Sequence, residues 1–389
     1  MSKLKKDKIA LILYARFPSE MAYGNHLIQI ANSFIKNEFD VNIYFPRTYN
    51  SKTIFEKPES FYDIKNNMNF VEVNNFDVTS YKLYEILPSF LKMLTYSINT
   101  LIWSRKLKKY LNNEDYVWST NPNILLIVKK FFKFVIYEKH GAARFIQKYS
   151  ITKLKKDSRV TLIGVTEKSV QELTMASRET LYLPNGVDSE LFFPQPRSSK
   201  ENLTVGYIGF LETYGVDKGV LNAVKEIVKI NEDIPINTLI AGGPNNKINE
   251  ISKYIKIKNQ SDYFDIKSFV PHKKVPEIIS NIDIGIIPYP GKGHMNLYAS
   301  PLKIFEFAAC GIPILASNIT SHLELKKLNL GIYYFQHDNF DDFKNKLIDL
   351  IGDKYLREDL RKKSLNNIKN LYWENRTKTI LKSVRSSTG

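Results

Sequence analysis

Short apolar runs alternate with amphipathic stretches along most of the 389-residue chain. Residues 8–15 (KIALILYA) form an apolar run, residues 25–37 repeat apolar positions every three to four residues, and residues 40–46 are apolar again. Short apolar runs predict buried strands, and the three-to-four spacing predicts helices. The alternation therefore predicts an α/β protein in which helices cover both faces of parallel sheets.

The same rhythm starts again in the second half of the chain, after a connection at residues 185–200 that is rich in Gly, Pro, Asn and Ser. Its apolar runs are residues 203–210, 236–243, 283–289 and 312–317. Two series of this kind predict two Rossmann-like, doubly wound domains.

We assign residues 1–190 to the first domain, residues 191–370 to the second, and residues 371–389 to a C-terminal helix that packs back toward the first domain. Ligands of open parallel sheets bind beyond the carboxyl ends of the strands. Two facing domains of this kind are therefore expected to form a central cleft, with the chemistry in strand-to-helix turns.

Composition restricts the cellular setting. The N-terminal lysines and the apolar run at residues 9–15 imitate a signal peptide, but Arg16 follows in place of a small-residue cleavage site, so we assign a buried strand there. The single cysteine, Cys310, allows no internal disulfide and no cysteine metal cluster, which suits a reducing cytoplasm. No apolar run reaches the roughly 18 residues of a membrane span.

The basic excess of the chain is concentrated in one region. The chain has 56 basic and 40 acidic residues, and residues 86–160 hold 15 basic residues against 4 acidic ones. An anionic partner is expected for this region, and nucleic acid, an anionic membrane surface and a phosphorylated substrate all remain candidates. A solvated basic face without a partner is the alternative.

Residues 87–111 are apolar and aromatic before Arg105 and strongly basic after it. One hypothesis places this helix in a membrane interface, with the basic end on anionic headgroups. The alternative is a core helix of the first domain with a solvated basic end. The side chains that the first hypothesis inserts into the membrane are Phe90, Leu94, Ile98 and Trp103.

Residues 300–313 (SPLKIFEFAACGIP) predict a helix with an anion site at its start. Ser300 is expected to cap the helix, and Pro301 suits the first helical position. The free N–H groups, the helix dipole and Lys303 fit a diphosphate, and Glu306 can accept hydrogen bonds from two ribose hydroxyls. The structural alternative is an exposed Lys303–Glu306 pair worth a few tenths of a kcal/mol.

Four segments of the sequence occur in the order and spacing of the family-4 glycosyltransferases, so the chain resembles that family over essentially its whole length. The segments are LPNGVDSELFFP (183–194), VPHKKVPEIISNIDIGIIPYP (270–290), SPLKIFEFAACGIPILAS (300–317) and YWENRTKTIL (372–381). The resemblance implies a GT-B fold, in which two Rossmann-like domains face a central cleft. It also implies transfer of a sugar from a nucleotide-sugar donor to a hydroxyl, with retention of configuration.

The resemblance assigns roles around the predicted helix. In the family a Glu-x7-Glu pair binds the donor: the second glutamate, which holds the ribose, falls on Glu306, and the first falls on Tyr298. The family arginine that binds the diphosphate falls on Phe210, and its lysine on Tyr214 or Lys218, depending on the register. With no arginine at Phe210, Lys303 is expected to carry more of the phosphate charge.

The predicted donor site combines the helix start with strand ends and with the segment whose backbone usually recognises the base. Gly243 belongs to a glycine pair that could equally be a tight turn without a ligand. The donor residues are Gly209, Lys218, Gly243, Val270, Val275, Tyr298, Ser300, Pro301, Leu302, Lys303 and Glu306.

The predicted catalytic residues are His140, Lys303 and Glu306. His140 follows an apolar run in YEKHGAARF and matches a family histidine beside the transferred sugar. Its expected role is to orient sugar hydroxyls and to stabilise developing charge. A lone histidine with a structural role is the alternative.

The loop at residues 16–26 is expected to help bind the acceptor, because it follows the first predicted strand. The family usually has adjacent glycines there, and Met21 and Ala22 occupy those positions. The predicted acceptor residues are Gly24, Asn25 and His26.

The sequence therefore predicts a cytoplasmic glycosyltransferase, peripheral on the inner face of the membrane, acting on a lipid-linked or glycan acceptor in cell-surface polysaccharide, lipopolysaccharide or glycolipid synthesis. No Asp-x-Asp stands at a predicted strand end, so we expect no metal, and no cofactor besides the nucleotide-sugar substrate. The alternatives are a sugar-nucleotide 2-epimerase and a non-catalytic sugar-nucleotide-binding protein. Nucleic-acid binding is not expected, because the basic region lacks a known binding module.

Overall fold

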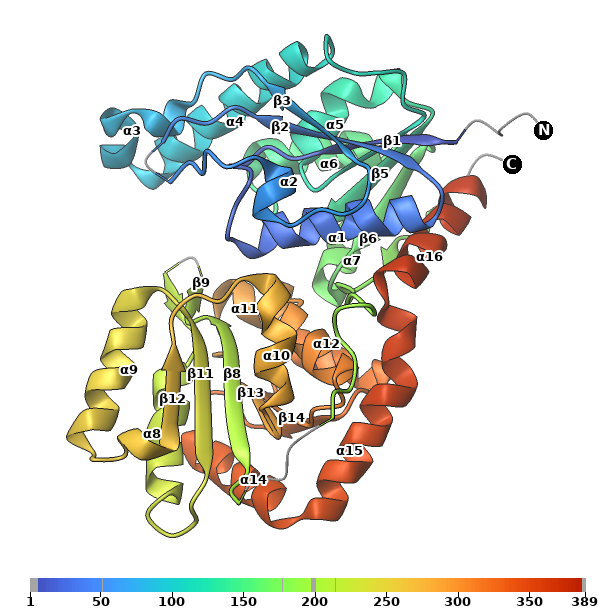
Figure 1. Ribbon diagram of the computed structural model, residues 1–389. Helices are drawn as coiled ribbons and strands as arrows, with labels where there is room; N and C mark the ends of the chain where they lie inside the picture. The colour runs from blue at the N-terminus through green and yellow to red at the C-terminus, as the bar shows by residue number, and fades with distance from the viewer. Residues whose placement is uncertain (1–5, 51, 177, 197–200, 214, 387–389) are drawn as a thin grey trace. The chain divides into compact units, whose positions relative to one another are not determined.

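The computed structural model describes residues 6–386 apart from 51, 177, 197–200 and 214 (Figure 1). The chain forms two compact units. The first unit comprises the chain up to Leu183 together with the segment from Trp373 onward, and the second comprises Pro184–Tyr372. The last helix of the chain is thus part of the first unit.

The first unit contains a seven-stranded sheet in the order β3-β2-β1-β4-β5-β6-β7, and all of its strand pairs are parallel. Strands β1 and β5 read as apolar runs because both faces of a parallel sheet are covered by helices. The strand order changes direction between β1 and β4, where open sheets bind ligands. The strands are β1 Lys8–Ile12, β2 Asp40–Pro46, β3 Asn69–Val73, β4 Tyr116–Ser119, β5 Phe134–Lys139, β6 Val160–Gly164 and β7 Leu181–Tyr182.

The helices of the first unit include one from the end of the chain, α16, which packs along α1 (Figure 1). The Ser33 and Thr377 hydroxyls are 2.6 Å apart, and Asn37 Nδ2 donates to the Glu374 carbonyl at 3.4 Å. The helices are α1 Ala22–Lys36, α2 Pro58–Phe61, α3 Lys82–Ile86, α4 Ser89–Leu107, α5 Pro122–Val128, α6 Phe145–Lys155, α7 Glu167–Leu173 and α16 Trp373–Ser386.

Helix α4, which covers most of residues 87–111, has one buried face and one exposed face. Trp103 is 1% exposed and donates its ring N–H to the Val73 carbonyl at 3.4 Å, so its expected insertion into a membrane is wrong. Asn99 and Leu107 are buried on the same face. Phe90 and Ile98, in contrast, are 64% and 47% exposed.

The second unit contains a six-stranded parallel sheet in the order β12-β11-β8-β13-β14-β15 and a small antiparallel β9–β10 ribbon. The prediction of two parallel-sheet α/β domains is therefore confirmed. The strands are β8 Thr204–Phe210, β9 Glu212–Thr213, β10 Val216–Asp217, β11 Asn237–Gly243, β12 Phe264–Lys267, β13 Ile284–Ile287, β14 Ile314–Ser317 and β15 Ile332–Phe335.

Helices cover the sheet of the second unit and share one buried apolar core with it. The amphipathic pattern of α8 illustrates this, because its valine, alanine and isoleucine positions face the core and are buried. The helices are α8 Val220–Ile230, α9 Asn245–Ile257, α10 Val275–Ser280, α11 Gly293–Tyr298, α12 Leu302–Ala309, α13 Thr320–Leu323, α14 Phe340–Gly352 and α15 Lys354–Asn367. Within the described part of the chain, none of the helices has the length and apolarity needed to cross a membrane.

Candidate functional site

Helix α12 begins one residue later than the sequence suggests. Pro301 is the residue before the helix, and no side chain caps it. The Ser300 hydroxyl instead accepts the Asn185 backbone N–H at 3.1 Å, and the Ser300 carbonyl accepts Asn185 Nδ2 at 2.7 Å. The predictions that Ser300 caps the helix and that Pro301 is helical are therefore wrong, because Asn185 holds the Ser300 backbone and hydroxyl outside it.

Glu306 is buried in the second unit together with two basic partners. It is 3% exposed; its Oε2 contacts Lys303 Nζ, and its Oε1 lies 3.2 Å from His272 Nε2. Burial by itself raises the pKa of this carboxyl, but Lys303 and His272 outweigh that effect and lower the pKa to about 2. The Lys303–Glu306 pair exists, but it is a buried ion pair, unlike the exposed pair of the structural alternative.

His272 is a member of this group that the sequence reasoning missed. It starts the 3-10 turn His272–Lys274, and its ring lies 5.4 Å from the Phe192 ring. The only sequence signal was its position between Val270 and Val275, where we expected backbone contacts. Val270 is half-buried, and Val275 is buried as the first residue of α10.

Gly209 and Gly243 lie at the carboxyl ends of β8 and β11, which pair side by side, with Gly242 opposite Gly209 and Gly243 opposite Phe210. A Cβ atom on Gly242 would be 1.8 Å from the Gly209 carbonyl oxygen, so the close approach of these strand ends requires glycine. The close approach of the two strands thus explains glycine at this position without any ligand. Ligand contact at Gly243 stays a prediction.

The remaining predicted donor residues have contacts of their own. Lys218 Nζ lies 5.0 Å from the centre of the Tyr289 ring. Tyr298 ends α11, is 8% exposed and stacks on His294 at 5.8 Å. Leu302 is the first residue of α12, and Tyr214 lies outside the described residues.

His140 directly follows β5 in the first unit and is joined to a buried carboxylate. Its Nε2 lies 2.7 Å from Glu138 Oε1, while 31% of the His140 side chain is exposed. Glu138 is fully buried and also accepts the Trp118 ring N–H at 3.2 Å. Arg376 of α16 places NH2 2.9 Å from Glu138 Oε1.

The sequence reasoning missed both Glu138 and Arg376 as site residues. A carboxylate inside the apolar run FVIYEKH was a usable signal for Glu138, because a buried charge needs a partner. Nothing in the local pattern of residues 372–381 marks Arg376 as that partner.

The predicted acceptor residues lie in the first five residues of α1, because the helix begins at Ala22; the expectation of a loop up to residue 26 is therefore wrong. His26 is 7% exposed, and its ring meets the His140 ring edge-on at 4.8 Å. Burial lowers the pKa of His26 to about 4 in spite of the nearby Glu138. Gly24 packs against the Tyr62 hydroxyl, and Asn25 is half-buried.

His26, Glu138 and His140 offer three potential metal ligands whose atoms lie within 4.8 Å of one another. The guanidinium of Arg376 already lies on the Glu138 oxygen that faces both histidines. A cation in this group would meet that fixed positive charge, so the donor set fits an ion-pair cluster better than a metal site.

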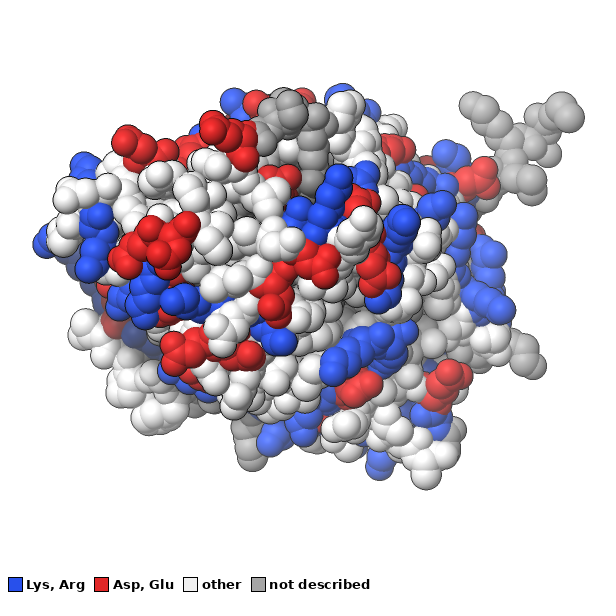
Figure 2. All heavy atoms as spheres, turned by 90° about the horizontal axis from the view of Figure 1, so that it is seen from below, with Lys and Arg blue, Asp and Glu red and all other residues white. Residues whose placement is uncertain are grey.

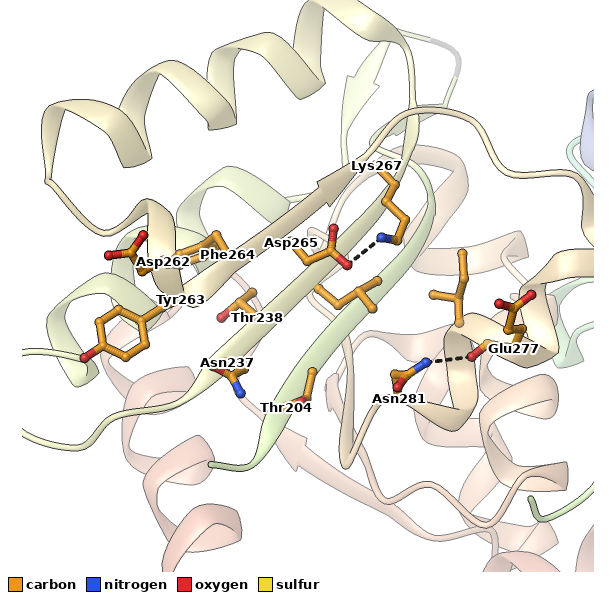
Figure 3. A pocket seen from close by; sticks show the side chains of 12 residues that line it. Thr204, Asn237, Thr238, Asp262, Tyr263, Phe264, Asp265, Lys267, Glu277 and Asn281 are labelled. Carbon is orange, nitrogen blue, oxygen red and sulfur yellow. Dashed lines mark hydrogen bonds and ion pairs between the residues drawn. The ribbon is translucent and has the colours of Figure 1, made fainter. Parts of the chain in front are cut away.

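A pocket of about 460 Å³ lies near the amino ends of three strands in the sheet of the second unit (Figure 3). Its walls include Thr204, Asn237 and Phe264, the first residues of β8, β11 and β12. Figure 3 also shows the Asp265–Lys267 pair at 2.5 Å on its rim. Because open parallel sheets bind ligands at the carboxyl ends of their strands, and no predicted site residue lines this pocket, we do not assign the donor to it.

Comparison with known proteins links the second unit to one family. Residues 188–367 match the family described as glycosyl transferases group 1. A curated relative from Bacillus subtilis, named "Putative teichuronic acid biosynthesis glycosyltransferase TuaH", is 28% identical over 168 residues, which are 41% of this chain. The chain spans only 40% of the length of that relative.

Solved structures resemble the chain over nearly its full length. A glycosyltransferase from Rickettsia africae has a TM-score of 0.72 and 15% identity, with 99% of each chain covered. TarM from S. aureus, in complex with Fondaparinux, alpha-GlcNAc-glycerol and UDP, has a TM-score of 0.69 and 12% identity, with 97% of this chain and 99% of TarM covered. These likenesses show the GT-B fold in both units, and residues 188–367 of the second unit are similar to the group 1 glycosyl transferases.

Proposed function

We propose that this protein transfers a sugar from a nucleotide-sugar donor to a hydroxyl acceptor, with retention of configuration, in the synthesis of a cell-surface glycan. The observation that carries the proposal is the buried carboxylate of Glu306 in α12, which is held ionised by Lys303 and His272. An ionised carboxylate has acceptors for two neighbouring ribose hydroxyls. The UDP in the TarM complex supports a nucleotide on this fold.

Lys303 is proposed to meet the diphosphate of the donor. Without a donor its ammonium neutralises Glu306, and 18% of its side chain is exposed, so it can turn toward a ligand. Cleavage of the glycosidic bond increases the negative charge on the diphosphate, so Lys303 and the free N–H groups of α12 act most strongly in the transition state. Positive charge from these groups is the basis for proposing chemistry without a metal.

The best test is donor binding by calorimetry with UDP, GDP, ADP and TDP sugars. We expect the wild-type protein to bind nucleotide sugars of one of these four bases, and we expect Glu306→Ala to lose most of that affinity. Glu277→Ala, which changes an exposed glutamate of the same unit, is the control. If none of the four classes binds, or if Glu306→Ala binds as the wild type does, the proposed donor site is wrong.

A turnover assay separates the alternatives. Release of the nucleotide only when an acceptor is present supports transfer, whereas epimerisation of the donor without an acceptor supports a 2-epimerase. Donor binding without turnover against any acceptor pool supports a non-catalytic binding protein. Activity that disappears with EDTA and returns with a divalent ion would overturn the metal-independent chemistry.

We further propose that the protein binds an anionic membrane through an apolar stripe on α4 and that it binds its acceptor there. The stripe consists of Phe90, Leu94, Ile98 and Ile102, which are 64%, 45%, 47% and 45% exposed. Their spacing of four residues places them along one side of the helix. Helix α3 adds Leu83 and Ile86, which are 65% and 77% exposed.

Hydrogen bonds connect α3 to α4, so these apolar residues belong to one surface region. Tyr84 Oη donates to the Lys92 carbonyl at 3.3 Å, and Lys92 Nζ donates to the Glu85 carbonyl at 2.6 Å. In Figure 1 the two helices lie next to each other at one end of the first unit. An apolar surface of this kind fits shallow insertion among lipid acyl chains.

The charge near the stripe supports an anionic lipid surface as the proposed partner. Exposed lysines and an arginine follow the stripe at the end of α4, and Lys108 and Lys130 flank the half-exposed Phe131 ring. On the face drawn in Figure 2, in contrast, basic and acidic side chains alternate. Basic residues near an anionic membrane contribute about 1 kcal/mol each.

Vesicle sedimentation tests this surface. We expect the wild type to bind equimolar phosphatidylglycerol–phosphatidylcholine vesicles and not pure phosphatidylcholine, and the Phe90→Ser, Ile98→Ser variant to lose binding while it keeps its cooperative melt. Tyr355→Ser, which removes an aromatic ring that is 89% exposed in the second unit, is the matched control. Equal binding by the wild type and the double variant would overturn the proposal.

A further inference from the structure

Glu138 occupies a position where a charge is costly. It is the second-to-last residue of β5, a strand whose six residues are all buried. Removing a carboxylate from water costs several kcal/mol unless polar groups surround it. Glu138 has four such groups, and they come from α1, β4, the end of β5 and α16.

The Glu138 carboxylate is ionised, because burial alone would raise its pKa but Arg376 and the two histidines hold the pKa well below its ordinary value. Arg376 has the strongest effect in that direction. An ionised carboxylate can only accept hydrogen bonds. The His140 nitrogen 2.7 Å away must therefore be the one that carries a proton.

This fixes the chemistry of the other His140 nitrogen. When Nε2 carries the proton in a neutral imidazole ring, Nδ1 is an acceptor. The His140 side chain is 31% exposed, so a ligand can approach the part of the ring that Glu138 does not engage. His26 packs edge-on against the same ring and limits its rotation.

We propose that Glu138 is a positioning residue, which Arg376 of the last helix holds in place, and that it fixes His140 with Nε2–H on Glu138 and Nδ1 available to accept a hydrogen bond from a sugar or acceptor hydroxyl. This inference rests on the proposed function, because it assigns His140 a part in sugar transfer. It also gives α16 a role in the site, since the end of the chain supplies the charge that keeps Glu138 ionised.

Nitrogen-15 NMR of the His140 ring tests the geometry without any ligand. We expect the Nε2–H tautomer at neutral pH in the wild type and a mixture of both tautomers in Glu138→Gln, because an amide can donate or accept. His140→Asn assigns the signals. Glu114→Gln is the matched control, since Glu114 is a buried carboxylate of the same unit that accepts from Asn42 at 2.8 Å and does not contact His140.

Turnover of the donor selected by calorimetry gives the second readout. We expect Glu138→Gln to lower kcat about 100-fold, as for a reacting group misplaced by roughly 1 Å, with the KM for the donor within about twofold of the wild type. Glu114→Gln should match the wild type in both constants. A purely structural role of Glu138 would change stability without this separation of kcat from KM.

Two results would overturn the proposal: an Nδ1–H tautomer in the wild type, or Glu138→Gln with the wild-type tautomer and kcat. If Glu138→Gln loses its cooperative melt, the Arg376→Lys variant is measured in its place. A retained Nε2–H tautomer with a lowered kcat in that variant supports the proposal. An unchanged kcat in that variant overturns the proposal. A wild-type protein that turns over no nucleotide sugar overturns the proposed function, and with it the role in transfer, even where the ring has the expected tautomer.

Discussion

Each unit of this protein buries one glutamate beside a histidine and a cation, and the two groups differ in the cation. In the second unit Lys303 lies one helical turn from Glu306, and 18% of its side chain is exposed. In the first unit Arg376 comes from the last helix and is 3% exposed. A lysine is a flexible point charge that can change partners, whereas a buried guanidinium is held in a fixed geometry.

The comparison indicates two uses of a buried carboxylate. Glu306 has a partner that can move aside, so its oxygens can become available to a ligand. Glu138 has a partner that stays in place, so it can hold a neighbouring ring and cannot easily accept a ligand itself. Substitutions at the two glutamates and at their basic partners test this difference.

Arg376→Met is expected to give the largest loss of stability, because it leaves the Glu138 charge buried without its guanidinium. Breaking a buried ion pair in this way costs about 3–5 kcal/mol. All three tryptophans of the chain lie in the first unit, so urea unfolding followed by tryptophan fluorescence reports on that unit. Arg385→Met, at an exposed position of the same helix, should change the free energy of unfolding by less than about 0.5 kcal/mol.

Lys303→Ala should slow turnover far more than it weakens donor binding, because charge on the leaving diphosphate grows in the transition state. The expected loss in kcat is about 10²–10³-fold, measured by steady-state kinetics. The Lys303→Ala, Lys218→Ala double variant shows whether both lysines share the diphosphate, since their effects are then non-additive. A kcat for Lys303→Ala within about twofold of the wild type, only ~0.4 kcal/mol on the barrier, would make this helix structural.

The free energy of unfolding should depend on the ionised state of Glu306 in acid. Its pKa in the folded protein is about 2, below its ordinary value, so its ionised form stabilises the fold at neutral pH and this contribution is lost as the pH falls from about 4.5 toward 2. Glu306→Gln lacks the contribution, so the difference in unfolding free energy between it and the wild type should shrink by up to about 3 kcal/mol over that range. Urea unfolding followed by circular dichroism at several pH values measures this difference, and parallel curves for the two proteins would contradict it.

Glu306→Ala should weaken donor binding by about 1.5–3 kcal/mol, the usual worth of a hydrogen bond to a charged group. Calorimetry with the preferred nucleotide sugar measures the change, and the melting temperature without a donor shows whether the fold is intact. Unchanged affinity would remove Glu306 from the donor site and would place both buried glutamates in the same, purely supporting class.

The sequence was sufficient for features that depend on local pattern. Apolar runs such as residues 8–15 and 203–210 predicted the strands of two parallel sheets, because a strand covered on both faces must be apolar throughout. The i, i+3 spacing of Lys303 and Glu306 placed them on one side of a helix, where the structure pairs them. The resemblance to a family added predicted roles for single residues, which local pattern could not assign.

Tertiary structure alone decided which distant residues meet. Helical periodicity shows that α4 has two faces but not which one is buried, and packing against Val73 turned Trp103 inward while Phe90 stayed exposed. Asn185 engaged Ser300 across the fold and moved the start of α12. Arg376 meets Glu138 only because α16 returns to the first sheet, and such a pairing between distant segments depends on packing that no local pattern of residues encodes.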